Sequence, residues 1–134
     1  MATKPNTRRV RSTRLTVHAV RDGLDVDEVE ALRADLQLSQ IDVERYLGIP
    51  RQTFARRKLA GRLNPAESDR VARFRKLSER AAMLLGGDHD AAVAWLKTPL
   101  AIFDGETPLM RATTELGAEQ VSDLILQLEH GIAV

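Results

Sequence analysis

Apolar residues recur along most of the chain at the three- and four-residue spacing of amphipathic α-helices. In residues 25–36 this stripe consists of Val26, Val29, Leu32 and Leu36, and acidic residues fill the first turn. A longer stripe precedes the Gly86-Gly87 break and consists of Val71, Phe74, Leu77, Ala81, Leu84 and Leu85. We therefore expect a core helix over residues 25–36 and a long helix over residues 65–85.

Capping residues and glycines divide the segment between these helices into two short helices. Ser39 can cap a helix that Gly48 would end, and Pro50 is well placed to open the next helix, which Gly61 would end. Two short helices joined by a tight turn that contains glycine are the pattern of a helix-turn-helix. The second of them would be the recognition helix, the one that enters the DNA groove.

A strong start signal precedes the long helix, and three more helices are expected after it. Asn64 can cap the long helix with Glu67 in the reciprocal position of a capping box. Residues 88–97 predict a helix, a short helix would open at Thr107-Pro108 and stop at Gly117, and the last helix would run from Ala118 to His130-Gly131. The expected fold class is all-α, a helix-turn-helix domain joined by a long helix to a small helical domain.

These elements suggest a flexible basic arm over residues 1–14, a DNA-binding domain over residues 15–63 and a helical domain over residues 64–134. The apolar stripe of the long helix suits either the core of the chain itself or the seam of a homodimer. The pattern leaves both possibilities open.

The composition excludes several classes of protein. The 134 residues contain no cysteine and no apolar run of membrane-spanning length, so we expect a soluble, cytoplasmic protein without disulfides or thiolate metal sites. Asp88, His89 and Asp90 are adjacent and would point about 100° apart on a helix, which suits capping better than metal binding. Motifs for a nucleophile, a phosphate loop or a zinc helix are missing. We expect no enzyme, no metal, no cofactor and no small-molecule substrate.

Charge is segregated along the chain although the net charge is only +1. Residues 1–14 hold five basic and no acidic side chains, and residues 38–63 hold six basic against two acidic. Residues 98–134 hold one basic against six acidic. This polarity suggests two partners, one a polyanion such as nucleic acid and one met by the carboxy-terminal part.

The side chains of the predicted recognition helix suit a DNA groove. Phe54 marks its buried side, Gln52 and Arg56 point away from it, and Thr53 and Arg57 flank them. Arginine can bond guanine and glutamine can bond adenine through two hydrogen bonds each. The basic residues expected to neutralise phosphates are Arg51, Lys58 and Arg62. The alternative is that these charges only form a solvated helix face.

In combination, these motifs resemble the Xre/MbcA/ParS family of antitoxins, the partners of RES-domain toxins in bacterial type II toxin-antitoxin pairs. The resemblance covers residues 38–134. It is carried in order by Leu47-Gly48-Ile49-Pro50-Arg51-Gln52-Thr53, Arg56-Arg57-Lys58, Gly61-Arg62-Leu63, Asn64-Pro65, Trp95-Leu96, Gly105, Thr107-Pro108-Leu109, Gly117 and Glu129-His130-Gly131.

The resemblance implies a homodimer that binds operator DNA of its own operon and covers the active site of a toxin that consumes NAD. The residues expected to approach the toxin are Pro108, Leu109, Met110, Arg111, Leu128, Glu129, His130, Gly131, Ile132, Ala133 and Val134. Two other functions stay open: a stand-alone transcriptional repressor whose last helices only dimerise, and an adaptor that binds proteins and no DNA.

Overall fold

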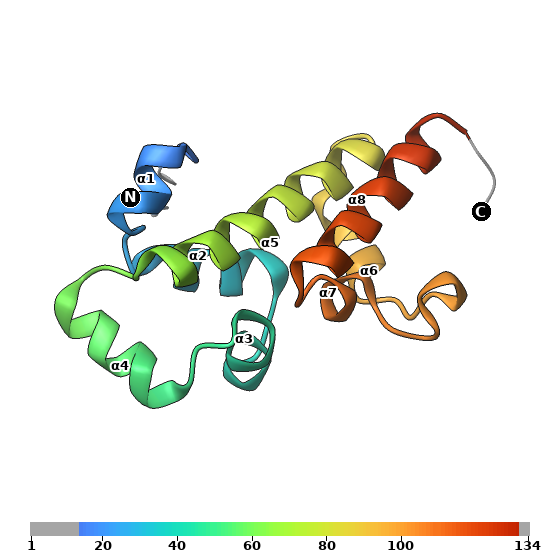
Figure 1. Cartoon of the computed structure of the whole chain (residues 1–134). Helices are drawn as coiled ribbons and strands as arrows, with labels where there is room; N and C mark the ends of the chain where they lie inside the picture. The colour runs from blue at the N-terminus through green and yellow to red at the C-terminus, as the bar shows by residue number, and fades with distance from the viewer. Residues whose placement is uncertain (1–13, 132–134) are drawn as a thin grey trace, which may run out of the picture. The chain divides into compact units, whose positions relative to one another are not determined.

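The chain is all-helical over the residues that the computed structural model describes, 14–131 (Figure 1). This part holds eight α-helices, one short 3₁₀ helix and no strand, apart from an isolated bridge between Asp25 and Arg62. The expected all-α class is confirmed. The chain divides into two compact units between Ala72 and Arg73, called here the N-terminal and the C-terminal unit.

The N-terminal unit contains the predicted helix-turn-helix. Its helices are α1 (Val17–Asp22), α2 (Asp27–Leu36), α3 (Gln40–Leu47), α4 (Arg51–Ala60) and the first two turns of α5 (Pro65–Leu84). Ser39 caps α3 by accepting a hydrogen bond from the Asp42 N–H, at 3.0 Å, and Gly48 and Gly61 end α3 and α4 in left-handed conformations. Helix α1 was not predicted. It has six residues and none of them is buried, so it carries no apolar stripe.

The core of the N-terminal unit combines positions of the predicted apolar stripes, such as Val29, Leu36 and Val71, with apolar residues outside those stripes. Its most deeply buried members are Leu24, Val29, Leu36, Leu47, Ile49 and Val71. Gly23 lies where two segments meet, since a Cβ at this position would be 2.2 Å from the Leu63 carbonyl oxygen. The Leu63 N–H in turn donates to the Leu24 carbonyl, at 2.9 Å. Backbone contacts of this kind join the end of the helix-turn-helix to the segment before α2.

The C-terminal unit contains the rest of α5, α6 (His89–Leu96), η2 (Ala101–Phe103), α7 (Pro108–Arg111) and α8 (Glu115–Glu129). Asp88, Thr107 and Thr114 cap α6, α7 and α8, each accepting a hydrogen bond of 3.0 Å from the N–H three residues on. The caps at Asp88 and Thr107 confirm the helix starts expected near these residues. The Thr114 cap places the start of α8 at Glu115, before the expected start at Ala118.

The prediction that Gly117 ends a helix is wrong. Gly117 lies inside the first turn of α8, which begins at Glu115. A Cβ there would be 1.7 Å from the Arg111 carbonyl oxygen. The glycine therefore allows α8 to pack closely against the end of α7, a tertiary reason that a helix-stop rule does not detect.

Most of the predicted apolar stripe of α5 is buried within the chain itself. Val71, Phe74, Leu77 and Ala81 are at most 2% exposed, whereas Leu84 and Leu85 at the end of the stripe are half-buried. The homodimer seam stays a prediction. The compact units divide inside α5, whereas the sequence suggested a boundary before it. In the described residues no group of acidic and histidine side chains could hold a metal, and no helix could span a membrane. The predicted basic arm, except Arg14, lies outside the described residues.

Candidate functional site

Helix α4 presents a polar and basic surface. Arg51, Gln52, Arg56 and Lys58 are exposed, as expected for groups that could meet DNA. Phe54 faces inward but is only half-buried, and the Lys58 Nζ lies 5.4 Å from the centre of its ring. Thr53 is also half-buried. Because no side chain of α4 is fully buried, this helix packs on its unit through few contacts.

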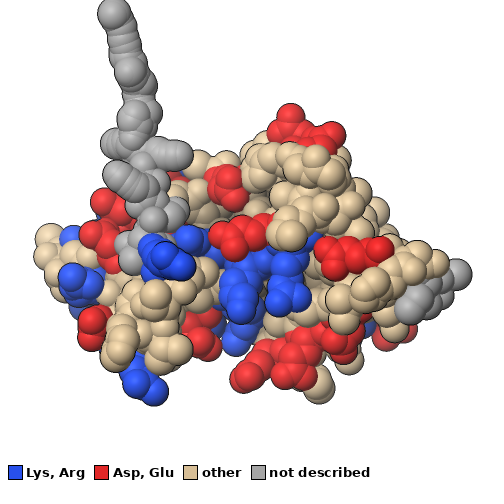
Figure 2. Space-filling model, turned by 90° about the horizontal axis from the view of Figure 1, so that it is seen from above, with Lys and Arg blue, Asp and Glu red and all other residues tan. Residues whose placement is uncertain are grey.

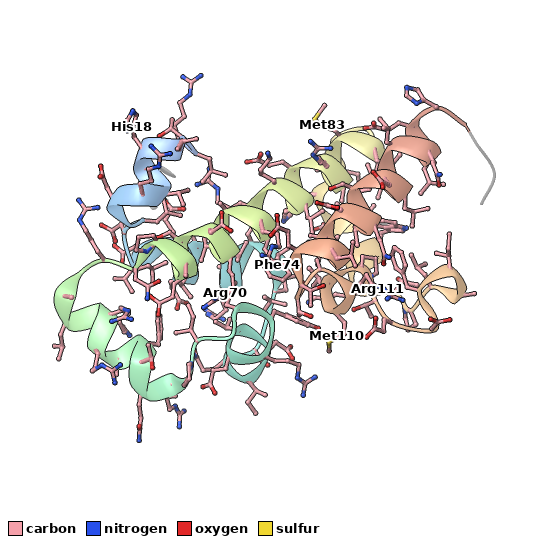
Figure 3. All side chains as sticks on the ribbon, in the orientation of Figure 1. His18, Arg70, Phe74, Met83, Met110 and Arg111 are labelled. Atoms are coloured by element: carbon pink, nitrogen blue, oxygen red, sulfur yellow. The ribbon has the colours of Figure 1, made fainter. Side chains whose placement is uncertain are left out.

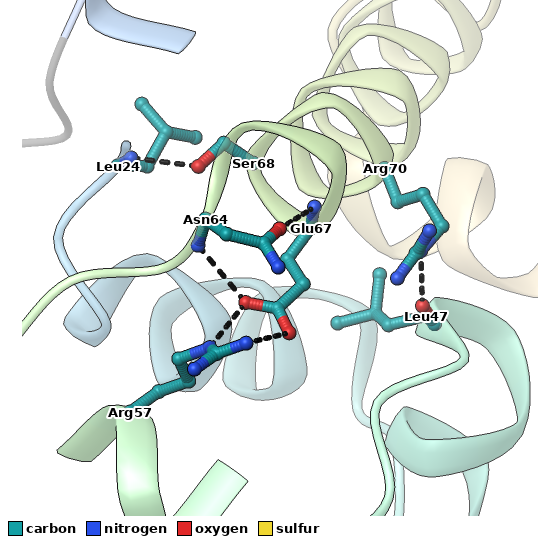
Figure 4. Close-up of polar contacts among 7 residues, drawn as sticks. All are labelled: Leu24, Leu47, Arg57, Asn64, Glu67, Ser68 and Arg70. Atoms are coloured by element: carbon teal, nitrogen blue, oxygen red, sulfur yellow. Dashed lines mark hydrogen bonds and ion pairs between the residues drawn. The ribbon is translucent and has the colours of Figure 1, made fainter. Parts of the chain in front are cut away.

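Arg57 has a partner that the sequence did not suggest. Its Nε donates to Glu67 Oε1 at 2.7 Å and its Nη2 donates to Glu67 Oε2 at 3.1 Å, which makes a two-point ion pair between α4 and α5 (Figure 4). The side chain of Arg57 is 26% exposed and that of Glu67 is 5% exposed. The guanidinium therefore turns toward the unit itself, and its contact is internal.

Glu67 performs two tasks at once. The Asn64 N–H donates to Glu67 Oε1 at 3.0 Å, and the Glu67 N–H donates to Asn64 Oδ1 at 2.7 Å. This reciprocal pair confirms the capping box expected from the sequence. The same carboxylate thus starts α5 and holds Arg57.

The protonation of Glu67 reflects these contacts. Burial alone raises the pKa of the Glu67 carboxyl, but the hydrogen bonds from Arg57 and from the Asn64 backbone lower it, as do the charges of Arg57 and Arg70. The net result is a pKa below the usual value. The hydrogen bond to Glu67 raises the pKa of Arg57, against a smaller opposing effect of desolvation. Both groups are charged at neutral pH.

Two more side chains of α5 anchor the N-terminal unit (Figure 4). Ser68 Oγ, which is buried, accepts a hydrogen bond of 2.8 Å from the Leu24 N–H. Arg70 Nε donates to the Leu47 carbonyl at the end of α3, at 2.6 Å. The start of α5 therefore binds α3, α4 and the segment before α2. No periodic signal in the sequence pairs these positions.

Arg62 also has an internal partner. Its Nη1 donates to the Gly23 carbonyl at 2.7 Å, in a part-buried contact. The seven residues predicted to bind DNA differ in exposure: Arg51, Gln52, Arg56, Lys58 and Arg62 are exposed, and Thr53 and Arg57 are half-buried. Two of the seven, Arg57 and Arg62, also have internal hydrogen-bond partners.

The residues expected to meet a toxin differ in their access to solvent. Pro108 and Leu109 are buried in the C-terminal unit, and Leu109 is 0% exposed. Neither side chain therefore offers surface to a partner, because both are needed in the core. Met110 and Arg111, labelled in Figure 3, are half-buried.

At the end of α8, Leu128 is half-buried, and Glu129, His130 and Gly131 are exposed. Residues 132–134, which complete the predicted toxin-binding set as Ile132, Ala133 and Val134, lie outside the described residues.

An open pocket of about 360 Å³ lies beside Arg111 in the C-terminal unit. It is lined by Ile102, Phe103, Asp104, Arg111, Gln120, Asp123, Leu124 and Gln127. The Arg111 guanidinium stacks over Phe103, 5.1 Å from the ring centre, and lies 3.2 Å from Glu106 and 3.8 Å from Asp104. The contact of its buried Nε with Glu106 has the distance of an ion pair but not the angle of a hydrogen bond. These acids offset the charge of Arg111.

Charges of both signs reach the surface. Figure 2 shows Lys and Arg side chains, and Asp and Glu side chains, in several separate groups on the face drawn. Charge counted along the sequence therefore overstates the basic surface, because ion pairs such as Arg57–Glu67 remove part of it. On α4 the exposed basic side chains are those of Arg51, Arg56 and Lys58.

The fold and these surfaces define a helix-turn-helix protein with a second, helical binding domain. Residues 16–76 match the antitoxin Xre-like helix-turn-helix domain, and residues 80–131 match the antitoxin Xre/MbcA/ParS C-terminal toxin-binding domain. The chain belongs to the Xre/MbcA/ParS family of antitoxins. It is accordingly an antitoxin and not an enzyme.

Relatives named antitoxin Xre support this assignment. One from Yersinia enterocolitica is 35% identical over 87% of this chain and 79% of its own length. One from Photorhabdus laumondii is 35% identical over 83% of this chain and 76% of its own length. A third, from Pseudomonas putida, is 34% identical over 66% of this chain and 56% of its own length.

Proposed function

We propose that this antitoxin neutralises a RES-domain toxin that consumes NAD by covering the toxin's active site, and that it represses its own operon by binding promoter DNA. The observation that carries the proposal is the presence in one chain of an Xre-like helix-turn-helix and the family's toxin-binding domain. A homodimer would present two copies of α4 to a two-fold symmetric operator.

Direct contact with DNA falls to the exposed side chains of α4. Gln52 and Arg56 lie four residues apart on one face and are free to reach base edges in the major groove. Arg51 and Lys58 lie beside them and suit phosphates. This division of tasks keeps the predicted base contacts and assigns the phosphate contacts to exposed side chains of α4. Arg62 is also exposed but donates a hydrogen bond to the Gly23 carbonyl.

Contact with the toxin is proposed for the pocket beside Arg111 and for the end of α8, residues 128–134. Asp104 has a side chain that is 96% exposed, and Asp123 is exposed on α8. Because acids outnumber the one cation in the pocket, it suits a basic side chain of the toxin. The toxin's NAD site must accept a diphosphate, so basic side chains are expected near it.

DNA binding is tested with a duplex from the promoter upstream of this reading frame and a random duplex of equal length. Wild-type protein should prefer the promoter, and its affinity should fall steeply with salt. Arg56→Ala should reduce the preference by about 1–3 kcal/mol. Equal binding of both duplexes by the wild-type protein would contradict the DNA-binding proposal.

Neutralisation is tested by co-expression with the neighbouring gene. Wild-type chain should protect cells and copurify with the gene product, and the mass of the complex gives the number of copies of each chain. Deletion of residues 128–134 should abolish protection and leave promoter binding intact. Full protection of cells by the truncated chain would contradict the toxin-binding assignment. A neighbouring gene that does not encode a RES-domain toxin would favour a stand-alone repressor.

A further inference from the structure

Helix α4 depends on few side chains for its orientation. Its exposed side includes Leu59, which is 92% exposed although it is apolar. Only Thr53, Phe54 and Arg57 are partly covered, and they lie on one face of the helix at spacings of three and four residues. Rotation of α4 about its axis is therefore resisted mainly by these three side chains.

Arg57 makes the most directional of these contacts. Two guanidinium nitrogens meet both oxygens of Glu67, so the pair fixes an orientation as well as a distance. Glu67 itself cannot shift easily, because its carboxylate and its backbone N–H are both engaged with Asn64. The rigid start of α5 is thus connected directly to the middle of α4.

The same contact lowers the value of Arg57 as a phosphate ligand. The Arg57–Glu67 pair is electrically neutral, whereas the affinity gained from phosphates comes from net positive charge that releases counterions. Arg51, Arg56 and Lys58 are exposed on the same helix, and no ion pair holds them in the described residues.

We infer that Arg57 is a positioning residue: its ion pair with Glu67 sets the rotation of α4 and thereby aims Gln52 and Arg56 at the bases. Arg57 then contributes to sequence preference without contacting DNA. The inference rests on the proposed binding of promoter DNA through α4. It gives Glu67, which no charge pattern marked as important for DNA, an indirect role in recognition.

The test compares promoter and random duplexes over a range of salt concentrations. In the double variant Arg57→Met/Glu67→Gln, two uncharged side chains replace an ion pair, so the net charge of the protein does not change. The side-chain oxygen of the glutamine can still accept the hydrogen bond from the Asn64 N–H. The preference for the promoter should fall roughly 5- to 150-fold, as for a lost base contact. The slope of log affinity against log salt should stay unchanged. Arg51→Met is the matched control: it should make this negative slope shallower by about 0.9 and weaken binding to both duplexes alike.

Two results would overturn the inference. A slope that is shallower by about 0.9 in the double variant would show that Arg57 neutralises a phosphate. An unchanged preference for the promoter in a folded double variant would show that the pair does not aim α4. Circular dichroism at the binding temperature checks folding.

The single variant Glu67→Gln decides the matter if the double variant unfolds. Glu67→Gln removes the ion pair and leaves the charge of Arg57 without a carboxylate partner. The preference of this variant for the promoter should fall because α4 is no longer held, whereas its affinity for random DNA should not fall because no positive charge is lost. An unchanged preference overturns the inference. Lack of preference in the wild-type protein would instead refute the proposed DNA binding.

Discussion

Alanine at position 117 is expected to destabilise the C-terminal unit, contrary to its usual effect in a helix. Gly117 lies in the first turn of α8, and alanine ordinarily stabilises a helix interior by about 0.8–1 kcal/mol relative to glycine. Here a Cβ would lie 1.7 Å from the Arg111 carbonyl oxygen and 2.8 Å from its carbon. Since carbon and oxygen atoms that are not bonded stay about 3.3 Å apart or more, α8 would have to retreat by about 1.5 Å.

The magnitude follows from two costs and one gain. Overpacking costs about 1–3 kcal/mol. The retreat would also weaken the Thr114 cap, in which Oγ1 accepts from the Gly117 N–H at 3.0 Å, a contact that stabilises by about 1 kcal/mol. After the gain of about 1 kcal/mol in helix propensity, the free energy of unfolding should fall by about 1–3 kcal/mol. The melting temperature should fall by roughly 4 °C per kcal/mol.

Urea unfolding followed by tryptophan fluorescence measures this effect in the right part of the chain. Trp95 is the single tryptophan and lies on α6 in the C-terminal unit. Glu119→Ala, an exposed change on the same helix, is the control and should alter stability by no more than about 0.5 kcal/mol. A midpoint for Gly117→Ala equal to or above that of the wild type would refute the close approach of α8 to Arg111.

Three other changes test the caps, the ion pair and the core. Asn64→Ala should lower the free energy of unfolding, measured by urea unfolding, by about 1 kcal/mol, because the Glu67 N–H loses its acceptor. Asn64→Ser, which keeps a capping oxygen, should retain most of the wild-type stability. Because the pKa of Glu67 is lower in the folded chain than in the unfolded chain, its charged form stabilises the fold at pH values above the ordinary carboxyl pKa. This stabilisation is lost as the pH falls through the lowered pKa. Between about pH 6 and about pH 3, the melting temperature of Glu67→Gln should therefore decline less than that of the wild type. An equal decline in both proteins would contradict this. Leu109→Ala should cost about 2–5 kcal/mol and weaken toxin binding by unfolding the unit; unchanged stability would contradict its burial.

Helix starts were predictable because their signals are local. Asn64 with Glu67 forms the expected capping box, and Asp88 and Thr107 cap where the sequence placed helix starts. A cap needs only side chains within three residues of the helix end. The prediction for Gly117 was wrong because glycine also permits close packing, and this use depends on how the end of α7 at Arg111 approaches α8, which no local pattern encodes.

Periodicity and the fixed order of motifs were enough to predict the all-α class, the helix-turn-helix spacing, most of the buried stripes and the family. Which charged and apolar side chains remain at the surface became clear only from the packing of the helices. Arg57 is an internal ion-pair partner and Leu109 is a core residue, although both lie in motifs that suggested contact with a partner. The physical reason is that exposure depends on what other segments bring to the same place, and a residue's own segment does not encode that.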